Sequence, residues 1–283
     1  MKRKLLFKSI LSIAFLSNAF VSYAYDYYEA NRYYNYVEGG YELTCYGGYD
    51  PNNRYKYSGN FVIPETVNGR KVVGIGSNAF KDCTALFTVS IPNTVTYIRR
   101  GAFDNCILLE NIVIPESVTD VECSFDGCTS LEYAFLPNSM TNLCSFSSCT
   151  NLNYVDMPDD LTTIGIGVFE DCTSLESIDI PDGVTTIRED AFAGCTALAS
   201  IELPEGVAAV GEGAFAGCTA LTSIEWPAEV TVVGDRTFSG CEKLATVTFS
   251  GRVREIGMYA FQNCTALTSI DIPESVTSIG SRA

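Results

Sequence analysis

The feature that most constrains this chain is a fixed spacing between cysteines. Nine of them follow one another at intervals of 23, 22, 21, 23, 23, 23, 23 and 23 residues, with a Phe three residues before each and a Leu three residues after each. They are Cys83, Cys106, Cys128, Cys149, Cys172, Cys195, Cys218, Cys241 and Cys264. A constant period of this length indicates a repeat protein, in which each unit is one small structural element.

Each unit predicts one strand and one turn. Residues 175–180 alternate between apolar and polar side chains, which is the period of a strand with one buried face. Pro181 then ends the strand, because proline cannot donate to a ladder. The Ala-Phe-x-x-Cys segment is long enough for only a short helical turn. Since one unit has too few apolar residues for a core, we expect a β-rich solenoid with one short parallel strand per repeat and short helical turns on the opposite side.

The repeat also resembles a known family. The pattern Leu-x-x-Ile-x-Ile-Pro-x-x-Val-x-x-Ile-Gly-x-x-Ala-Phe-x-x-Cys is similar to the BspA-like subfamily of leucine-rich repeats, and it extends from Asn60 to Ala283. The resemblance implies a right-handed leucine-rich repeat solenoid at or outside the cell surface, with a role in adhesion to host or neighbouring-cell proteins. It supplies no catalytic motif.

The chain divides into three parts. Residues 1–24 combine a basic start with an apolar run over residues 10–21, which predicts a secretory signal peptide. A membrane anchor is the alternative, but the run is short for a span. Residues 25–59 hold eleven of the sixteen tyrosines and predict an end cap, or alternatively an adhesive arm. Residues 60–283 form the solenoid, about nine repeats with the last one incomplete. The expected location is secreted or at the cell surface.

Composition excludes several classes of function. The formal charge is −16, and removal of four basic residues with the signal peptide (−16 − 4) gives −20 for the mature chain. Such a chain repels nucleic acid and anionic membranes. Histidine is absent, which removes the commonest general base. With no phosphate loop or nucleophile motif either, we expect no enzyme, no cofactor and no metal site.

The outward side of the predicted strands supplies the candidate binding residues. Carboxylates occupy the position four residues after the Leu in four consecutive units, and aromatic side chains lie just upstream on the same face. The candidates are Tyr133, Phe135, Tyr154, Asp156, Asp179, Glu202 and Glu225. They favour contact with a basic protein, or less directly with Ca²⁺. The alternatives are that the carboxylates only provide solubility and that the aromatics are buried under another part of the chain.

The twelve cysteines fall into two groups. We expect the nine repeat cysteines to be buried, reduced thiols, with disulfides between neighbouring units as the alternative. Cys123 and Cys144 lie five residues before their repeat cysteine, a position that we expect to face outward, in the two shortened units. Neighbouring coils bring these two within reach of a disulfide. A zinc site that also uses Cys128 and Cys149 is the alternative.

The sequence therefore supports two hypotheses. The first is an adhesin-like protein that recognises an extracellular or cell-surface protein through its strand face. The second is a structural envelope or matrix protein that associates end to end, because the sequence stops halfway through a unit and leaves a C-terminal edge. Truncation of a longer chain is a further explanation of that edge.

Overall fold

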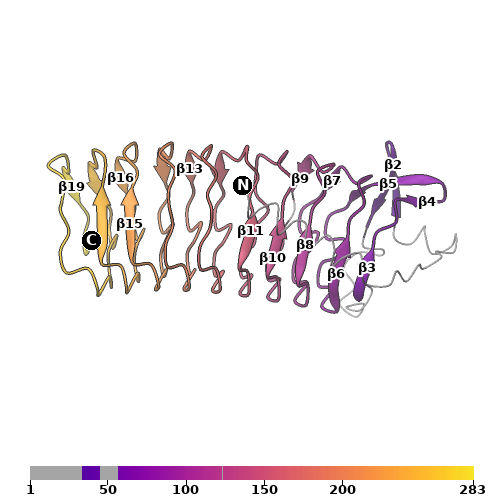
Figure 1. The fold of residues 1–283 in the computed structure, drawn as a ribbon, viewed down its shortest axis with the longest axis horizontal. Coiled ribbons are helices and arrows are strands. Elements are labelled where there is room, and N and C mark those ends of the chain that lie inside the picture. The colour runs from indigo at the N-terminus through magenta and orange to yellow at the C-terminus, as the bar shows by residue number, and fades with distance from the viewer. Residues whose placement is uncertain (1–33, 45–56, 123) are drawn as a thin grey trace.

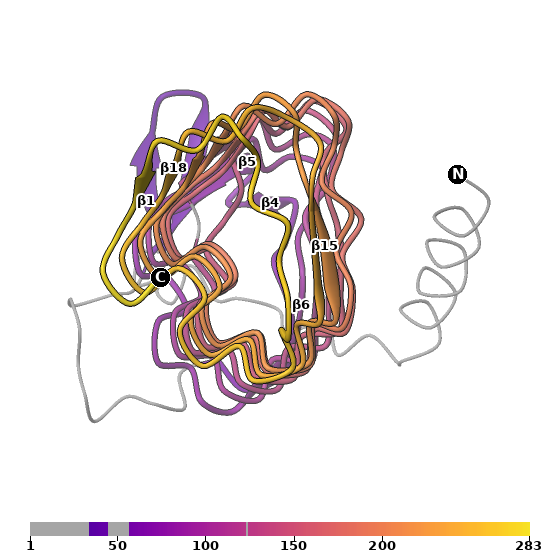
Figure 2. The same ribbon diagram turned by 90° about the vertical axis from the view of Figure 1, so that its left-hand side faces the viewer.

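The described part of the chain is a solenoid of stacked coils (Figure 1). The computed structural model describes residues 34–44, 57–122 and 124–283. Figure 2 looks along the solenoid and shows successive coils superimposed, with β15 (Ser223–Trp226) and β18 (Glu255–Ile256) on different walls. Each wall consists of short strands that pair mainly with the equivalent strands of neighbouring coils.

The front wall lies where the sequence predicts strands, but residues 175–180 and the equivalent residues 198–203 form no strand, so the strand predicted there is wrong. We define the front wall as these two segments and β15 together with β3 (Gly59–Val62), β6 (Leu86–Ser90), β8 (Asn111–Val113), β10 (Tyr133–Phe135), β11 (Tyr154–Asp156) and β17 (Thr246–Phe249). Its pairs β3–β6, β8–β10–β11 and β15–β17 are all parallel.

The back wall is a second series of strands, most of them two residues long. It comprises β18 together with β5 (Arg70–Ile75), β7 (Tyr97–Ile98), β9 (Asp120–Val121), β12 (Thr163–Ile164), β13 (Thr186–Ile187), β14 (Ala209–Val210), β16 (Val232–Val233) and β19 (Ser278–Ile279). The sequence predicts only one strand per repeat, so this series is an addition. At the N-terminal end β1 (Tyr34–Val37), β2 (Gly40–Leu43) and β4 (Thr66–Val67) join it through β5.

Strand pairing places equivalent residues of successive units side by side. Thr186 pairs with Ala209 on the back wall. In the shortened units Tyr133 pairs with Asn111 on one side and with Tyr154 on the other. The register therefore follows the repeat, and the predicted parallel leucine-rich repeat solenoid is confirmed.

The core consists of files of identical side chains. The nine repeat phenylalanines, Phe80 to Phe261, stack with centroid separations from 5.1 to 5.8 Å and interplanar angles from 2° to 13°. The repeat leucines from Leu86 to Leu244 are also buried. At the N-terminal end Tyr57 and Phe61 lie against Phe80 at 4.7 and 5.6 Å, and cover the file there. The predicted boundaries of the signal peptide and cap remain predictions.

The short helical turns are a wrong prediction, because the residues that the structure describes contain no helix. Alternate amides of the turn segments donate to the next coil instead, as Phe192 N does to Ala214 O at 2.8 Å, whereas Ala193 N donates to Asp190 O within its own turn. In addition, the residue before each repeat cysteine has a left-handed backbone, as at Asp171 with φ of 58°. A right-handed helix cannot continue through that conformation. Over residues 34–44, 57–122 and 124–283, no helix could cross a membrane.

Candidate functional site

The outward side of the front wall carries a row of exposed carboxylates on three consecutive coils. We call Asp179, Glu202 and Glu225 the first carboxylate row; all three are exposed. The coils that carry them are in register, since Ala199 N donates to Glu176 O at 3.1 Å and Thr222 N to Ala199 O at 3.3 Å. The structure thus brings together the three acidic residues that the sequence placed there.

A second row runs beside the first and was not among the sequence candidates. Asp182, Glu205 and Glu229 are exposed in the turn that follows each strand-ending proline, and we call them the second carboxylate row. The signal was present in the sequence, because an acidic residue follows most of these prolines by one or two positions. Among the ion pairs between described residues, none involves either row. The carboxylate of Glu225 does accept a hydrogen bond from Ser250 Oγ at 2.8 Å.

The aromatic candidates are less open than the sequence suggests. Phe135 and Asp156 are buried, with exposed fractions of 4% and 3%, whereas Tyr133 and Tyr154 are half-buried. The Phe135 and Tyr154 rings pack at 6.0 Å, which accounts for part of the burial of Phe135. The expectation of exposure is therefore wrong for Phe135 and Asp156. Their role as partner contacts, like that of the two tyrosines, remains a prediction.

Tyr154 contacts the buried carboxylate of the neighbouring Asp156. Its hydroxyl donates to Asp156 Oδ1 at 3.4 Å. Burial raises the pKa of Tyr154 to about 12, and the nearby charges of Asp156 and Asp179 act in the same direction. Tyr154 therefore remains a neutral hydrogen-bond donor at physiological pH.

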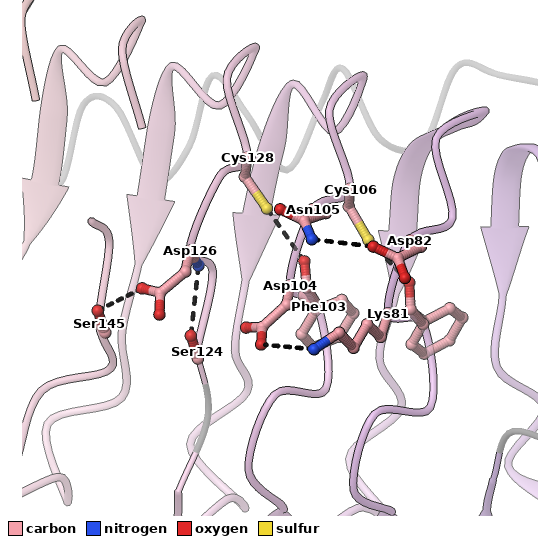
Figure 3. Close-up of polar contacts among 11 residues, drawn as sticks. Lys81, Asp82, Phe103, Asp104, Asn105, Cys106, Ser124, Asp126, Cys128 and Ser145 are labelled. Atoms are coloured by element: carbon pink, nitrogen blue, oxygen red, sulfur yellow. Dashed lines mark hydrogen bonds and ion pairs between the residues drawn. The ribbon is translucent and has the colours of Figure 1, made fainter. Parts of the chain in front are cut away.

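The nine repeat cysteines are buried, reduced thiols, as the sequence predicts. Eight of them donate their thiol to the carbonyl oxygen of the repeat Phe one coil earlier, as Cys128 does to Phe103 O at 3.1 Å (Figure 3). Burial is the main cause that raises the pKa of Cys195 to about 12 and of Cys264 to about 11. These thiols satisfy backbone acceptors inside the core and are poor nucleophiles.

Alkaline pH is expected to destabilise the fold through this thiol file. The pKa of Cys195 and of Cys241 is about 12 in the folded chain, against an ordinary value of 9.0. Because folding raises the pKa, the contribution of the protonated thiols to stability is complete below pH ~9. It is lost as the pH rises toward ~12, since the unfolded chain loses the thiol protons first. Urea denaturation from pH 8 to 11 should show the decline, and Cys195→Ala should make it shallower. An identical pH dependence in Cys195→Ala would contradict the assignment.

Cys144 differs from the repeat cysteines and from its predicted orientation. It is buried, with 1% exposed, and it is disulfide-bonded. The expectation that it faces outward is wrong. In full-length units the equivalent residue, such as Gly167, has a left-handed backbone, whereas Cys144 does not. The shortened units thus follow a different path here, and the bridge between Ser124 and Ser145 holds their coils together.

We expect the partner of Cys144 to be Cys123, which lies outside the described residues. The nine repeat cysteines are reduced, and the paired residues Ser124 and Ser145 directly follow the two cysteines in sequence. Mass spectrometry of unreduced proteolytic peptides should recover the Cys123 and Cys144 peptides as one species, which reduction separates. Recovery of both peptides as free thiols would contradict the bond. The zinc alternative is disfavoured, because the thiols of Cys128 and Cys149 donate to core carbonyls.

A polar edge follows the turns beside the thiol file (Figure 3). Lys81 lies 3.8 Å from Asp104, and Asn105 Nδ2 donates to Asp82 Oδ1 at 2.9 Å. Ser145 donates to Asp126, whose own amide donates to Ser124 Oγ. All of these contacts except the one between Asp126 and Ser124 join neighbouring coils, so these polar side chains have a structural role in the turns. No group of three or more His, Cys, Asp or Glu side chains in the described ranges is arranged to hold a metal.

These features define a class of protein: a β-solenoid whose units are leucine-rich repeats, with an acidic outer face on one wall. The family model described as "BspA type Leucine rich repeat region (6 copies)" matches residues 54–176 and 162–283. The chain belongs to the BspA-type leucine-rich repeat family.

Solved structures of other leucine-rich repeat proteins are similar to this chain. One from Bacteroides ovatus has 25% identity and a TM-score of 0.49, covering 87% of this chain and 88% of that chain. One from T. pallidum has 26% identity and a TM-score of 0.44, with coverage of 85% and 90%. A leucine rich cell surface protein from Faecalibacterium prausnitzii has 23% identity and a TM-score of 0.47, with coverage of 90% and 95%. A comparison with curated proteins found no match.

Proposed function

We propose that this chain is a secreted or cell-surface recognition protein, without catalytic activity, that binds a basic extracellular protein through its front wall. The observation that carries the proposal is the pair of exposed carboxylate rows, which have no cationic partner among the described residues. The signal-peptide pattern of residues 1–24 supports the location. Membership of a repeat family with extended exposed walls supports the binding role.

Electrostatics favours binding of a basic partner over solubility as the explanation of why the carboxylates are aligned in rows. Charges about 5 Å apart in water repel by roughly 0.8 kcal/mol per pair, so stacked carboxylates carry a cost that scattered ones would avoid. A basic partner would relieve this repulsion, and it would be steered to the wall by the field of the rows. The cost is small enough for the fold to tolerate in the free protein.

The test is neutralisation of the first carboxylate row. We expect the variant Asp179→Asn, Glu202→Gln, Glu225→Gln to fold normally and to bind its partner about 10-fold more weakly, with a reduced salt dependence. Surface plasmon resonance against a panel of purified basic extracellular-matrix and cell-surface proteins measures both effects.

A matched control separates position from total charge. The variant Glu122→Gln, Glu212→Gln, Glu255→Gln removes the same number of charges near the back-wall strands, from exposed residues. It should bind like the wild type. Equal weakening by both variants, or an absence of binding to every member of the panel, would contradict the proposal.

Self-association is the second candidate, and the C-terminal coil favours it. Ile272 and Ile279 are 43% and 59% exposed there. Together with Phe261 and Leu267 they line a cavity of about 330 Å³. Sedimentation velocity should show growth with concentration that Ile272→Ser, Ile279→Ser abolishes. A monomer at all concentrations would exclude this candidate and leave the first one standing.

A further inference from the structure

The surface between the two carboxylate rows is apolar. On two of the three coils the chain passes from a first-row carboxylate through a partly buried aliphatic residue and a proline to the second row, as in Asp179, Ile180, Pro181 and Asp182. On the third coil the residues in between include Trp226 and Pro227, which are both buried. Pro181 and Pro204 are half-buried, and Ile180 and Leu203 pack partly on the core. On the coils of Asp179 and Glu202 the front wall therefore presents an apolar strip bordered on both sides by negative charge. This is the complement of an amphipathic segment with an apolar stripe and basic flanks.

The spacing of the coils selects among the conformations that such a segment can take. The ring centroids of Phe169 and Phe192 are 5.3 Å apart, and those of Phe192 and Phe215 are 5.6 Å apart. These phenylalanines belong to the coils that carry Asp179, Glu202 and Glu225. On the front wall the coils are joined by backbone hydrogen bonds, which place neighbours about 4.7–4.9 Å apart. An α-helix advances about 5.4 Å per turn, so over three coils a helix along the solenoid axis presents nearly one turn to each coil. An extended strand repeats a face only every ~6.6–6.8 Å and loses register within a few coils.

The width of the strip gives the same answer. Asp182 and Glu205 lie three positions after the first-row carboxylate of their coil, and Glu229 lies four positions after Glu225, so the chain between the two rows spans at most about 10–14 Å. A helix with side chains has a diameter of about 10–12 Å, so cations on its two flanks reach both rows at once. A strand presents a single line of side chains to the surface and would meet one row only.

We propose that the apolar strip and its two carboxylate rows bind a basic amphipathic α-helix of a partner protein, laid along the solenoid axis. Its apolar stripe lies on Ile180, Pro181, Leu203 and Pro204, and Lys or Arg side chains three and four residues apart meet the carboxylates of successive coils. This inference rests on the proposed function, since it requires the front wall to be the binding surface. It adds the secondary structure and direction of the bound segment.

The experiment compares two synthetic peptides of about 16 residues with identical composition, equal numbers of Leu and Lys. One has Leu at helical spacing with Lys on both flanks, and the other alternates Leu and Lys. Isothermal titration calorimetry should give about 10-fold tighter binding for the helical isomer. Circular dichroism should show that this peptide gains helicity when the protein is added.

Protein variants then distinguish the geometry from the charge. Neutralising the second row, by Asp182→Asn, Glu205→Gln, Glu229→Gln, should weaken binding of the helical peptide about 10-fold and leave binding of the alternating peptide nearly unchanged. Equal affinity of the protein for the two isomers, or an equal loss of affinity for both in this variant, would overturn the helix proposal. The proposal that the front wall binds a basic partner would still stand. If neither peptide binds, both the helix proposal and the acidic binding surface fail.

Discussion

Replacing Phe192 with alanine is expected to lower the free energy of unfolding by about 3–5 kcal/mol. The ring is fully buried and stacks between Phe169 and Phe215 at 5.3 and 5.6 Å, so its loss opens a cavity in the middle of the file. Neighbouring coils cannot close the gap, because their backbones are fixed by hydrogen bonds such as Phe192 N to Ala214 O. Urea denaturation followed by far-ultraviolet circular dichroism measures the loss.

Phe87 provides the matched control for this substitution. It is 43% exposed and lies outside the stacked file. Phe87→Ala deletes the same atoms, and we expect it to cost less than about 1 kcal/mol, since little buried area is lost. Similar losses at both positions would mean that the stacked file does not carry the stability of the solenoid.

Gly251→Ala is expected to destabilise the fold by about 2–3 kcal/mol through overpacking. A Cβ at this position would lie 2.0 Å from Ala228 O and 2.5 Å from two further atoms of Ala228. The obstacle is backbone, which a side-chain rotation cannot remove. This is the one unit in which a serine, Ser250, replaces the strand-ending proline. Its amide donates to Trp226 O at 3.3 Å, which draws the two coils together.

Gly206→Ala is the control that shows whether the destabilisation expected for Gly251→Ala comes from the contact with Ala228 or from the loss of a glycine. A Cβ at Gly206 would lie 3.7 Å from Asp182 O and 3.9 Å from Val184 O, which are ordinary contacts. We expect this variant to change stability by less than about 1 kcal/mol, with a small gain from the stiffer unfolded chain. Thermal and urea unfolding of both variants decide the point. If Gly251→Ala and Gly206→Ala change the free energy of unfolding equally little, the close approach of Gly251 to Ala228 is contradicted.

The candidate site was predictable only in part. The first carboxylate row could be predicted because its residues are one repeat apart in the sequence. When the coils stack in parallel register, residues with this spacing lie next to one another. The burial of Phe135 and Asp156 does not follow, since it depends on packing around the two shortened coils. The second carboxylate row was missed because Asp182 and Glu229 lie at different offsets from their repeat leucines. In three dimensions both are exposed in the turn that follows the strand.

The sequence by itself determined the architecture of this protein. Each unit is too small to bury its own Phe, Cys and Leu, so stacking in register was the available way to form a core, and the phenylalanine and thiol files confirm it. Only the tertiary structure determined the backbone conformation of the Ala-Phe-x-x-Cys turns. Ala191 has a high helix propensity, but alternate amides of this turn, those of Phe192 and Gly194, donate to the next coil and are not available to a helix. Contacts between neighbouring coils outweighed a local preference that is worth only a fraction of a kcal/mol, roughly, per residue.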